Sequence, residues 1–506
     1  MTSAQILILL AIAVYLLFML WIGWICAKKN ESVDDFYLGG RKLGPFVTAM
    51  SAEASDMSSW LLMGLPGVAY LTGLAEASWT AIGLAVGTYL NWLIVAARIR
   101  RYSHHLDAIT VPQFFSKRWG DDRHLLSAIA ALVIIIFFIP YTASGFSACG
   151  KLFSTLFGMD YIAAMLISAA VIVIYTVMGG FLAASFTDLI QSIIMTIALV
   201  VVLGFGVVQA GGVDAVMENA RSMTDYLSLL RIHDPATGGS NPYSLLTICS
   251  LRAWGLGYFG MPHILVRFMA IENEQKLKLS RRVASSWVVI SMGVAIIIGV
   301  IGNAMSKVGA LEQLADSETV IVRIASLISE YGALPALLAG VILAGILAAT
   351  MSTADSQLLA ASSSISQDLG NDFLKRNFSG KRGMVVARSV MIVISLIAAF
   401  LARDPNSSVF RVVSFAWAGF GAAFGPVMLT ALCWKRSNKW GALAGMLTGG
   451  VMVFVWKFLI TPMGGAWAIY ELLPAFLCAL VAIVAVSLLT PAPERAIQTL
   501  FDEVQK

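Results

Sequence analysis

The segment from Met50 to Gly67, MSAEASDMSSWLLMGLPG, combines residue types that are rare inside an apolar helix. Two carboxylates lie three residues apart, among hydroxyl and helix-weakening residues: Glu53, Asp56, Ser51, Ser55, Ser58, Ser59, Gly64, Pro66 and Gly67. A carboxylate facing hydrocarbon is costly, so such residues face a bundle interior or a watery cavity. A membrane tolerates irregular backbone only where it lines a cavity. Because carbonyl, hydroxyl and carboxylate oxygens bind small hard cations, the segment predicts a broken transmembrane helix that holds a cation.

A second unusual stretch, Leu337 to Gln357, begins apolar and ends in polar residues. At helical spacing Ala349, Ser352 and Thr353 fall on one face, which offers two hydroxyls and a carbonyl. The alternative is that the hydroxyls only bond back to their own helix or pack against a neighbour. Interrupted segments in both halves of a chain indicate a transporter site between inverted repeats.

The third stretch is LRAWGLGYFGMPHILVRF, in which four helix breakers fall within eight residues: Gly255, Gly257, Gly260 and Pro262. Trp254 and Tyr258 lie four residues apart and are expected to share a helix face. A ring pair beside unwound backbone can close over a small ligand. The alternative is the aromatic belt at a membrane interface, which Trp and Tyr generally populate.

Three single residues are less decisive. Tyr141 follows Pro140 and can lie at a kink. Asp188 in SFTDLIQS is expected to open a span, where an N-terminal helix acid or a cation path would equally explain it. Glu53 has three interpretations, namely a protonated acid, an ion-paired acid, or an acid facing a water cavity.

The composition indicates a polytopic membrane protein. Of 506 residues, 58% are hydrophobic and only 12% are charged, whereas soluble proteins carry about 25% charged residues. The apolar run Ile6 to Ile25 lacks a basic start and a cleavage site, so it is expected to be a retained helix. The five cysteines form no CxxC or Cys/His set, which argues against a disulfide framework or a zinc site. The net charge of +5 is better explained by cytoplasmic loops than by nucleic-acid binding.

The hydropathy pattern predicts about thirteen spans in an all-α protein. Their approximate ranges are 5–26, 46–72, 76–97, 124–155, 160–180, 187–210, 244–268, 283–306, 331–357, 384–402, 408–433, 440–460 and 467–490. Lys and Arg gather in alternate connections, such as RIRRYSHH and ENEQKLKLSRR. The positive-inside rule therefore predicts an external N-terminus and a cytoplasmic C-terminus. The longest external segment, about Gly211 to Pro242, is expected to be a polar loop with a short amphipathic helix.

These stretches resemble the sodium/solute symporter family, and most closely its sodium/proline members. The resemblance rests on four long motifs in order: DDFYLGGRKLGPFVTAMSAEASDMSSWLLMGLPG, WGLGYFGMPHILVRFMA, LAATMSTADSQLL and SFAWAGFGAAFGPV. It implies a five-plus-five inverted-repeat core with broken helices in a single transporter domain. The first repeat would cover 46–210 and the second 244–433, with 1–45 and 434–506 peripheral.

The resemblance also assigns candidate residues. The implied sodium ligands are the carbonyls of Ala54, Met57 and Ala349 and the hydroxyls of Ser352 and Thr353. Asp56 and Asp188 would be sodium-linked acids. The residues implied for proline binding and external gating are Ser58, Tyr141, Trp254, Tyr258 and Pro262.

The function expected on this basis is sodium-driven uptake of L-proline by alternating access in the cell inner membrane. Na+ is the coupling ion, and L-proline and membrane lipid are the partners. No enzymatic activity, organic cofactor, nucleic acid or obligatory protein partner is expected. The rival functions are a sodium symporter for another small carboxylate such as pantothenate or acetate, a channel, and the sensor half of a signalling protein.

Overall fold

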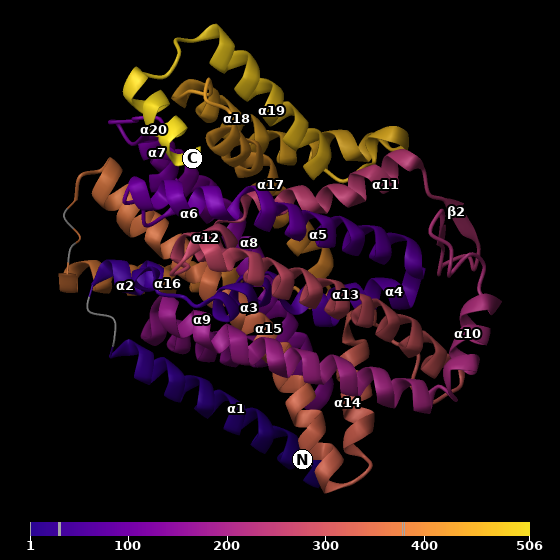
Figure 1. Cartoon of the computed structure of the whole chain (residues 1–506). Helices are drawn as coiled ribbons and strands as arrows, with labels where there is room; N and C mark the ends of the chain where they lie inside the picture. Colours follow the sequence, from indigo (N-terminus) through magenta and orange to yellow (C-terminus); the bar gives the residue numbers. More distant parts are fainter. Residues whose placement is uncertain (1, 29–31, 377, 379, 506) are drawn as a thin grey trace.

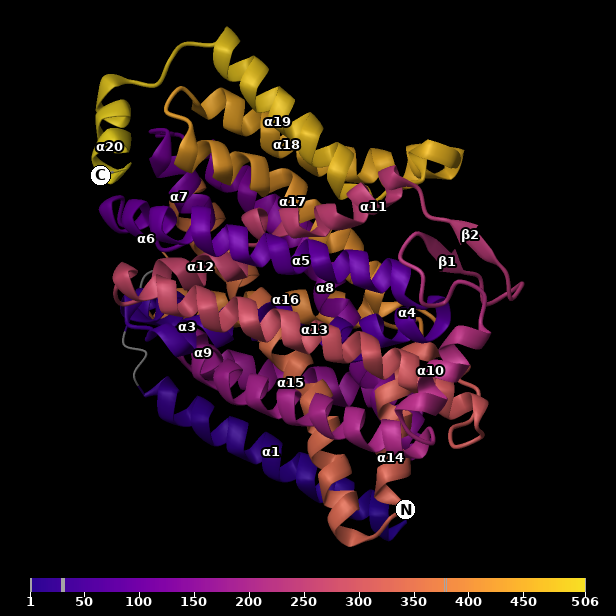
Figure 2. The same cartoon turned by 45° about the vertical axis from the view of Figure 1, so that its right-hand side comes forward.

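The computed structural model describes residues 2–28, 32–376, 378 and 380–505, and it is a helical bundle (Figures 1 and 2). The first half of the chain contains α1 (Ser3–Ala27), α2 (Val33–Leu38), η1 (Gly39–Arg41), α3 (Pro45–Asp56), η2 (Trp60–Gly64), α4 (Leu65–Thr72), α5 (Leu74–Ile94), α6 (Ala96–His105), α7 (Val111–Arg118), α8 (Leu125–Phe157), α9 (Tyr161–Gln209), α10 (Val213–Ser222), β1 (Arg231–His233) and β2 (Ser240–Pro242). The second half contains α11 (Leu245–Arg252), η3 (Ala253–Gly260), α12 (Pro262–Ala270), η4 (Glu274–Lys276), α13 (Leu277–Lys307), η5 (Ser317–Thr319), α14 (Val320–Ser329), α15 (Ala333–Ser363), η6 (Ser364–Phe373), α16 (Gly380–Leu401), α17 (Val409–Cys433), α18 (Lys439–Val455), η7 (Trp456–Ile460), η8 (Thr461–Met463), η9 (Gly465–Trp467), α19 (Leu472–Leu489) and α20 (Arg495–Gln505).

Nine helices in the described part of the chain are long and apolar enough to cross a membrane, or ten if the bent pair α5–α6 is one span. The other three of the thirteen expected spans correspond to interrupted or shorter helices: α3–η2–α4, the first part of α9, and α11–η3–α12. The number of membrane spans therefore depends on how the broken helices are counted. A membrane protein tolerates such breaks where the freed backbone is covered by protein or lines a cavity.

The predicted break in the second span lies at Met57. Helix α3 ends there because Met57 leaves the helical region, with φ −74° and ψ 64°. The Ser58 amide then bonds the Asp56 carbonyl (2.7 Å). The chain continues through the wide turns of η2 into α4, with Pro66 near the start of that helix. The serines, glycine and proline of this stretch thus interrupt the helical hydrogen bonds directly beside Asp56.

The expected fifth and sixth spans, 160–180 and 187–210, are the two parts of α9, and they join at a kink without an intervening loop. The element α9, Tyr161–Gln209, consists of two helices that meet at Gly180, where φ is 66° and ψ −172°. Asp188 therefore lies inside a helix, eight residues beyond the kink, and does not open one. The explanation of Asp188 as an N-terminal helix acid fails for the same reason.

The two ends of the bundle differ in their connections. Helix α10 and the antiparallel β1–β2 hairpin lie at one end, and α6, α7 and α20 lie at the other (Figures 1 and 2). The short helix expected between Gly211 and Pro242 is confirmed as α10, whereas the hairpin is a small β element that the all-α expectation lacked. The fold class is otherwise as expected from the sequence.

Candidate functional site

The candidate sodium ligands of α3 and α15 lie in contact. The Ser352 hydroxyl donates to the Ala54 carbonyl (2.8 Å), and it also lies 3.1 Å from the Ala349 carbonyl. The Thr353 hydroxyl donates to the same Ala349 carbonyl (3.2 Å). All four residues are buried. Two carbonyls and two hydroxyls therefore converge at the break of α3, and this neutral oxygen set suits a monovalent hard cation.

Asp56 joins this break to η3. The Tyr258 hydroxyl donates to Asp56 Oδ2 (2.5 Å), and the Tyr141 hydroxyl donates to the Asp56 carbonyl (3.3 Å). Asp56 Oδ1 is buried and has no hydrogen-bond partner. Two tyrosines that the sequence singled out separately thus meet at one acid, from α8 and from η3.

Trp254 and Tyr258 do not share a face as expected. Residues 253–260 form a 3₁₀ helix with three residues per turn, so positions four apart differ by about 120° in direction. Trp254 stacks on Tyr470 (centroids 5.2 Å apart, 19° between planes), whereas Tyr258 turns toward Asp56. Both rings contact Trp417, at 6.3 Å and 5.1 Å, so they meet through a third ring.

Two glycines of η3, Gly257 and Gly260, allow α17 to pack closely against η3 and do not leave open backbone. A Cβ on Gly257 would lie 1.9 Å from the Trp417 indole nitrogen, and one on Gly260 would lie 2.2 Å from the Phe420 carbonyl. The Trp417 indole donates to the Trp254 carbonyl (2.7 Å). Pro262 is the first residue of α12, where its missing amide leaves no bond unmade.

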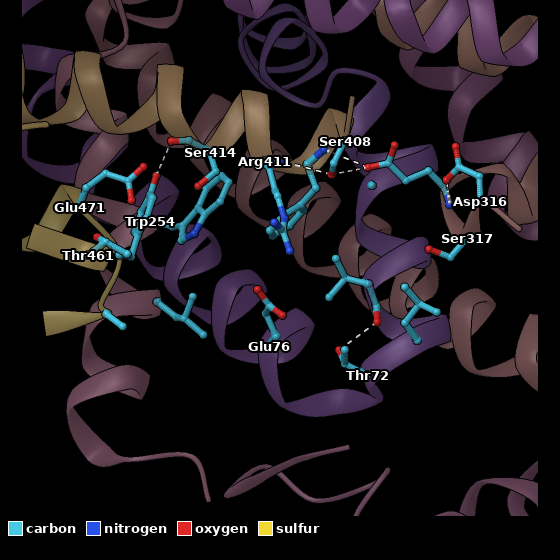
Figure 3. Close-up of a pocket in the computed structure, with 18 of the residues that line it drawn as sticks. Thr72, Glu76, Trp254, Asp316, Ser317, Ser408, Arg411, Ser414, Thr461 and Glu471 are labelled. Carbon is cyan, nitrogen blue, oxygen red and sulfur yellow. Dashed lines mark hydrogen bonds between the residues drawn. The ribbon is translucent and has the colours of Figure 1, made fainter. Parts of the chain in front are cut away.

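A cavity of about 830 Å³ reaches Trp254 from the end of the bundle that carries α10 and the hairpin. Figure 3 shows Trp254 and Ser414 on one side of it, Ser408, Asp316 and Ser317 on the other, and Glu76 and Thr72 below. Tyr258 lies one turn beyond Trp254 and does not line this cavity. The candidate substrate residue Trp254 is thus reachable from one end, and Asp56 lies deeper.

The opposite side of the site is closed by a buried ion pair. Arg267 Nη2 lies 2.8 Å from Asp188 Oδ2, and both side chains are at most 1% exposed. Ser51 and Ser356 complete the cluster: Arg267 donates to both hydroxyls at 2.6 Å, and Ser51 donates to Asp188 (2.6 Å). The Ser356 hydroxyl also lies 2.8 Å from the Ser352 carbonyl. The cluster around Asp188 and Arg267 therefore joins α9, α12, α3 and α15, and its Ser356 lies one helical turn from Ser352.

The structure excludes one of the three interpretations of Glu53. Its Oε1 accepts the Trp92 indole N–H (2.9 Å), and its Oε2 is buried without a partner. Among the described residues, no basic side chain forms a salt bridge with Glu53, so the interpretation of Glu53 as an ion-paired acid is wrong. Ser58 is buried too, and its hydroxyl lies 3.4 Å from the Trp60 amide.

Sequence reasoning missed Trp417, Arg267 and Trp92. Trp417 is the tryptophan of the motif SFAWAGFG, but a tryptophan in an apolar run carries no local signal of its partner. Arg267 is a cation within the apolar run HILVRFMA and could have been matched with the buried Asp188 on charge alone. Nothing in the neighbourhood of Trp92 indicates its contact with Glu53, 39 residues away.

A family model described as the Sodium:solute symporter family matches residues 36–449. The chain belongs to this family. It is therefore a multi-pass membrane transporter that couples sodium to the movement of a solute, and not an enzyme.

Curated relatives of this symporter match over nearly its whole length. It is 41% identical to the osmoregulated proline transporter OpuE of Bacillus subtilis over 501 residues, which is 99% of this chain and 98% of the relative. It is 42% identical to a sodium/proline symporter of Haemophilus influenzae (98% and 97% covered) and 41% identical to one of Escherichia coli (98% and 95% covered).

Two solved structures share the fold. A Na+-coupled sialic acid symporter in a substrate-bound outward-open state matches with a TM-score of 0.77 at 18% identity, over 97% of this chain and 99% of that one. Mhp1, a nucleobase-cation-symport-1 family transporter in a closed conformation, matches with a TM-score of 0.55 at 14% identity, over 92% and 98%. At these identities the likeness concerns the fold alone.

Proposed function

We propose that this symporter couples sodium to the uptake of L-proline by alternating access. The observation that carries the sodium part is the contact of Ser352 with the Ala54 carbonyl, where the break of α3 meets α15. The proline part is supported by relatives at 41–42% identity whose names state proline transport. The ligands would be Ala54, Met57, Ala349, Ser352 and Thr353, with Asp56 and Asp188 as nearby acids.

Coupling in this proposal follows from shared elements. In the structure the oxygens of α3 and α15 satisfy one another, and a sodium ion would take the place of these hydrogen bonds. Asp56 is the last residue of α3 and holds Tyr258 of η3, so an ion that orders the end of α3 also orders η3. The effect must be reciprocal, because two ligands that favour one state strengthen each other's binding by the same factor.

Proline would bind where the large cavity meets η3. Trp254 offers flat apolar surface for a pyrrolidine ring, and Tyr258, Tyr141, Ser58 and Pro262 are the other candidates. The cavity of about 830 Å³ exceeds the space that one proline fills, so a closing movement of the aromatic residues is part of the proposal. The buried Arg267–Asp188 pair would keep the opposite side shut while the cavity is open.

The placement in the membrane is also a proposal. Lys and Arg gather at the end of the bundle that carries α6, α7 and α20, for example at Arg98, Arg100, Arg101, Lys117 and Arg118. The positive-inside rule makes this end cytoplasmic, with an external N-terminus in a cell inner membrane. Residues 46–210 and 244–433 would then form the two inverted repeats of a single transporter domain.

The test is radiolabelled L-proline uptake into proteoliposomes with an inward sodium gradient. We expect saturable uptake that requires sodium and ceases when choline replaces it. Pantothenate and acetate serve as competing substrates, and stronger sodium-dependent uptake of either would overturn the proline assignment. A flux that does not saturate, at rates far above enzyme-like turnover, would indicate a channel instead.

A further inference from the structure

The last turn of α3 carries two buried carboxyl groups, and one sodium ion can balance only one of them when both are ionised. Glu53 and Asp56 lie three residues apart there, and both are at most 1% exposed. The C-terminal end of a helix adds partial negative charge of its own. Buried charges in a membrane protein are normally paired, yet among the described residues no salt bridge reaches either acid. Arg267 donates to Ser51, which lies earlier in α3, but its guanidinium is already paired with Asp188.

Each acid has one oxygen in use and one oxygen free. Trp92 of α5 donates to Glu53 Oε1, and Tyr258 of η3 donates to Asp56 Oδ2. The other two oxygens, Glu53 Oε2 and Asp56 Oδ1, are buried without a partner. The donors hold the carboxylates in place and leave one lone-pair-rich atom on each for a further ligand.

A neutral oxygen from α5 lies in the same place. Thr88 precedes Trp92 by one helical turn, and its hydroxyl is buried without a partner. Thr88 and Glu53 both lie around the Tyr258 hydroxyl that holds Asp56. Helices α5 and η3 are in backbone contact at this level, since a Cβ on Gly87 would meet Gly255 at 2.3 Å. Two unpartnered carboxylate oxygens of α3 and the Thr88 hydroxyl of α5 thus lie near the Tyr258 hydroxyl.

This cluster is separate from the α15 contacts. Ala54 is held by Ser352 of α15, whereas Glu53 and Asp56 are held from α5 and η3. The two oxygen sets are held from different elements, and among the described residues no hydrogen bond from α15 reaches the Glu53 or Asp56 side chain.

We propose that Glu53, Asp56 and Thr88 form a second sodium site, so that this symporter binds two sodium ions. Its ligands are Glu53 Oε2, Asp56 Oδ1 and the Thr88 hydroxyl, and the ion balances the second carboxylate. The site ties α5 to the broken helix and to η3, and it makes the driving force for solute uptake depend on two ions. The proposal rests on the sodium coupling of the proposed function.

The experiment counts bound 22Na+ on the purified full-length protein in lipid nanodiscs, at fixed pH and without proline. We expect two ions per wild-type protein and one in Glu53→Gln. Ser352→Ala should retain the Glu53 site and weaken only the other. One ion in both wild type and Glu53→Gln, or two in both, would overturn the second site. One ion in both proteins would mean that Glu53 binds a proton in place of a sodium ion.

Thr88→Val is the second variant, because it keeps the shape of the side chain if Glu53→Gln does not fold. It should weaken one of the two ions at least fivefold. Thr80→Val is its matched control, since Thr80 is also a buried α5 threonine with an unpartnered hydroxyl, but lies eight residues before Thr88. Equal effects of the two valines would contradict the proposal. Because proline is absent, the binding count is independent of uptake: two ions without sodium-driven proline uptake would refute the proposed function alone.

Discussion

The chain contains two interruptions beside Asp56, and they are built in opposite ways. At Met57, α3 ends among serines, and the neighbouring side chains are hydroxyls and acids. In η3 the interruption is a glycine-rich 3₁₀ helix that packs against rings, including Trp417 and Tyr470, and against the backbone of α5. The first interruption concentrates oxygen atoms, and the second lets large apolar side chains approach the backbone.

This difference suggests a division of labour. Oxygens without competing donors suit an ion that has lost its water, whereas close-packed rings suit an apolar solute ring. The Tyr258–Asp56 hydrogen bond is the direct link between the two interruptions. If the division is real, substitutions on each side should change the response to one ligand first and to the other only through coupling.

Trp254→Ala is expected to have the largest effect, and it acts on the proline side. Losing this ring removes an apolar wall worth about 1–3 kcal/mol of binding, which is roughly tenfold to a hundredfold in the apparent proline constant. Proline-free sodium binding should change little, because among the described residues no hydrogen bond or ring contact joins Trp254 to a candidate sodium ligand. Uptake kinetics and 22Na+ binding are to be measured on the same preparation.

The control for Trp254→Ala is Trp440→Ala, since Trp440 is 48% exposed on α18. It should leave the proline constant unchanged. Normal proline affinity in Trp254→Ala would mean that this ring is interfacial packing and that η3 is not the substrate site.

Asp56→Asn is expected to come next, and it acts on the sodium side. The substitution removes one unit of charge at a buried point, where charge interactions amount to several kcal/mol. A loss of at least about 1.4 kcal/mol would raise the sodium concentration for half-maximal uptake by about tenfold or more. The measurement is sodium-dependent uptake at saturating proline. An unchanged sodium requirement in a normally inserted variant would remove Asp56 from the ion site.

The interruption at Met57 could be predicted because its signals are local. Acids, serines, glycine and proline within eighteen residues conflict with an apolar helix wherever the segment lies. Asp188 was expected to open the sixth span, whereas the helix that contains it begins several residues earlier, at the Gly180 kink. The contacts of Trp417 with Trp254 and of Arg267 with Asp188 join residues 163 and 79 positions apart. Such partners depend on how helices pack, which no local pattern contains.

Ser352→Ala and Thr353→Ala should produce smaller changes on the sodium side. Each removes one hydroxyl that contacts the Ala349 carbonyl, at 3.1 Å and 3.2 Å. A loss of about 1 kcal/mol for one such contact would raise the sodium requirement about fivefold. Proline affinity at saturating sodium should be nearly normal.

Ser395→Ala is the matched control for the two hydroxyls. Ser395 is a buried serine of α16 whose hydroxyl only bonds back to the Met391 carbonyl (2.7 Å). If Ser352→Ala behaves like Ser395→Ala, the Ser352 hydroxyl has no role beyond its own helices. A collapse of proline binding with a normal sodium response would move both hydroxyls to the substrate site.

Tyr258→Phe should give the smallest change, and its direction tests the link between the two interruptions. The substitution keeps the ring against Trp417 and removes only the hydroxyl that donates to Asp56 Oδ2. Without this donor the buried carboxylate is less well compensated in the sodium-free state, so an added cation should bind more tightly. We expect the sodium concentration for half-maximal uptake to fall about threefold, which corresponds to about 0.7 kcal/mol. Tyr141→Phe is the comparison, because its hydroxyl reaches only the Asp56 carbonyl, at 3.3 Å, and it should shift the sodium response less. A higher sodium requirement in Tyr258→Phe would show that the hydroxyl helps to hold the ion, and the division between an ion side and a ring side would then fail at this residue.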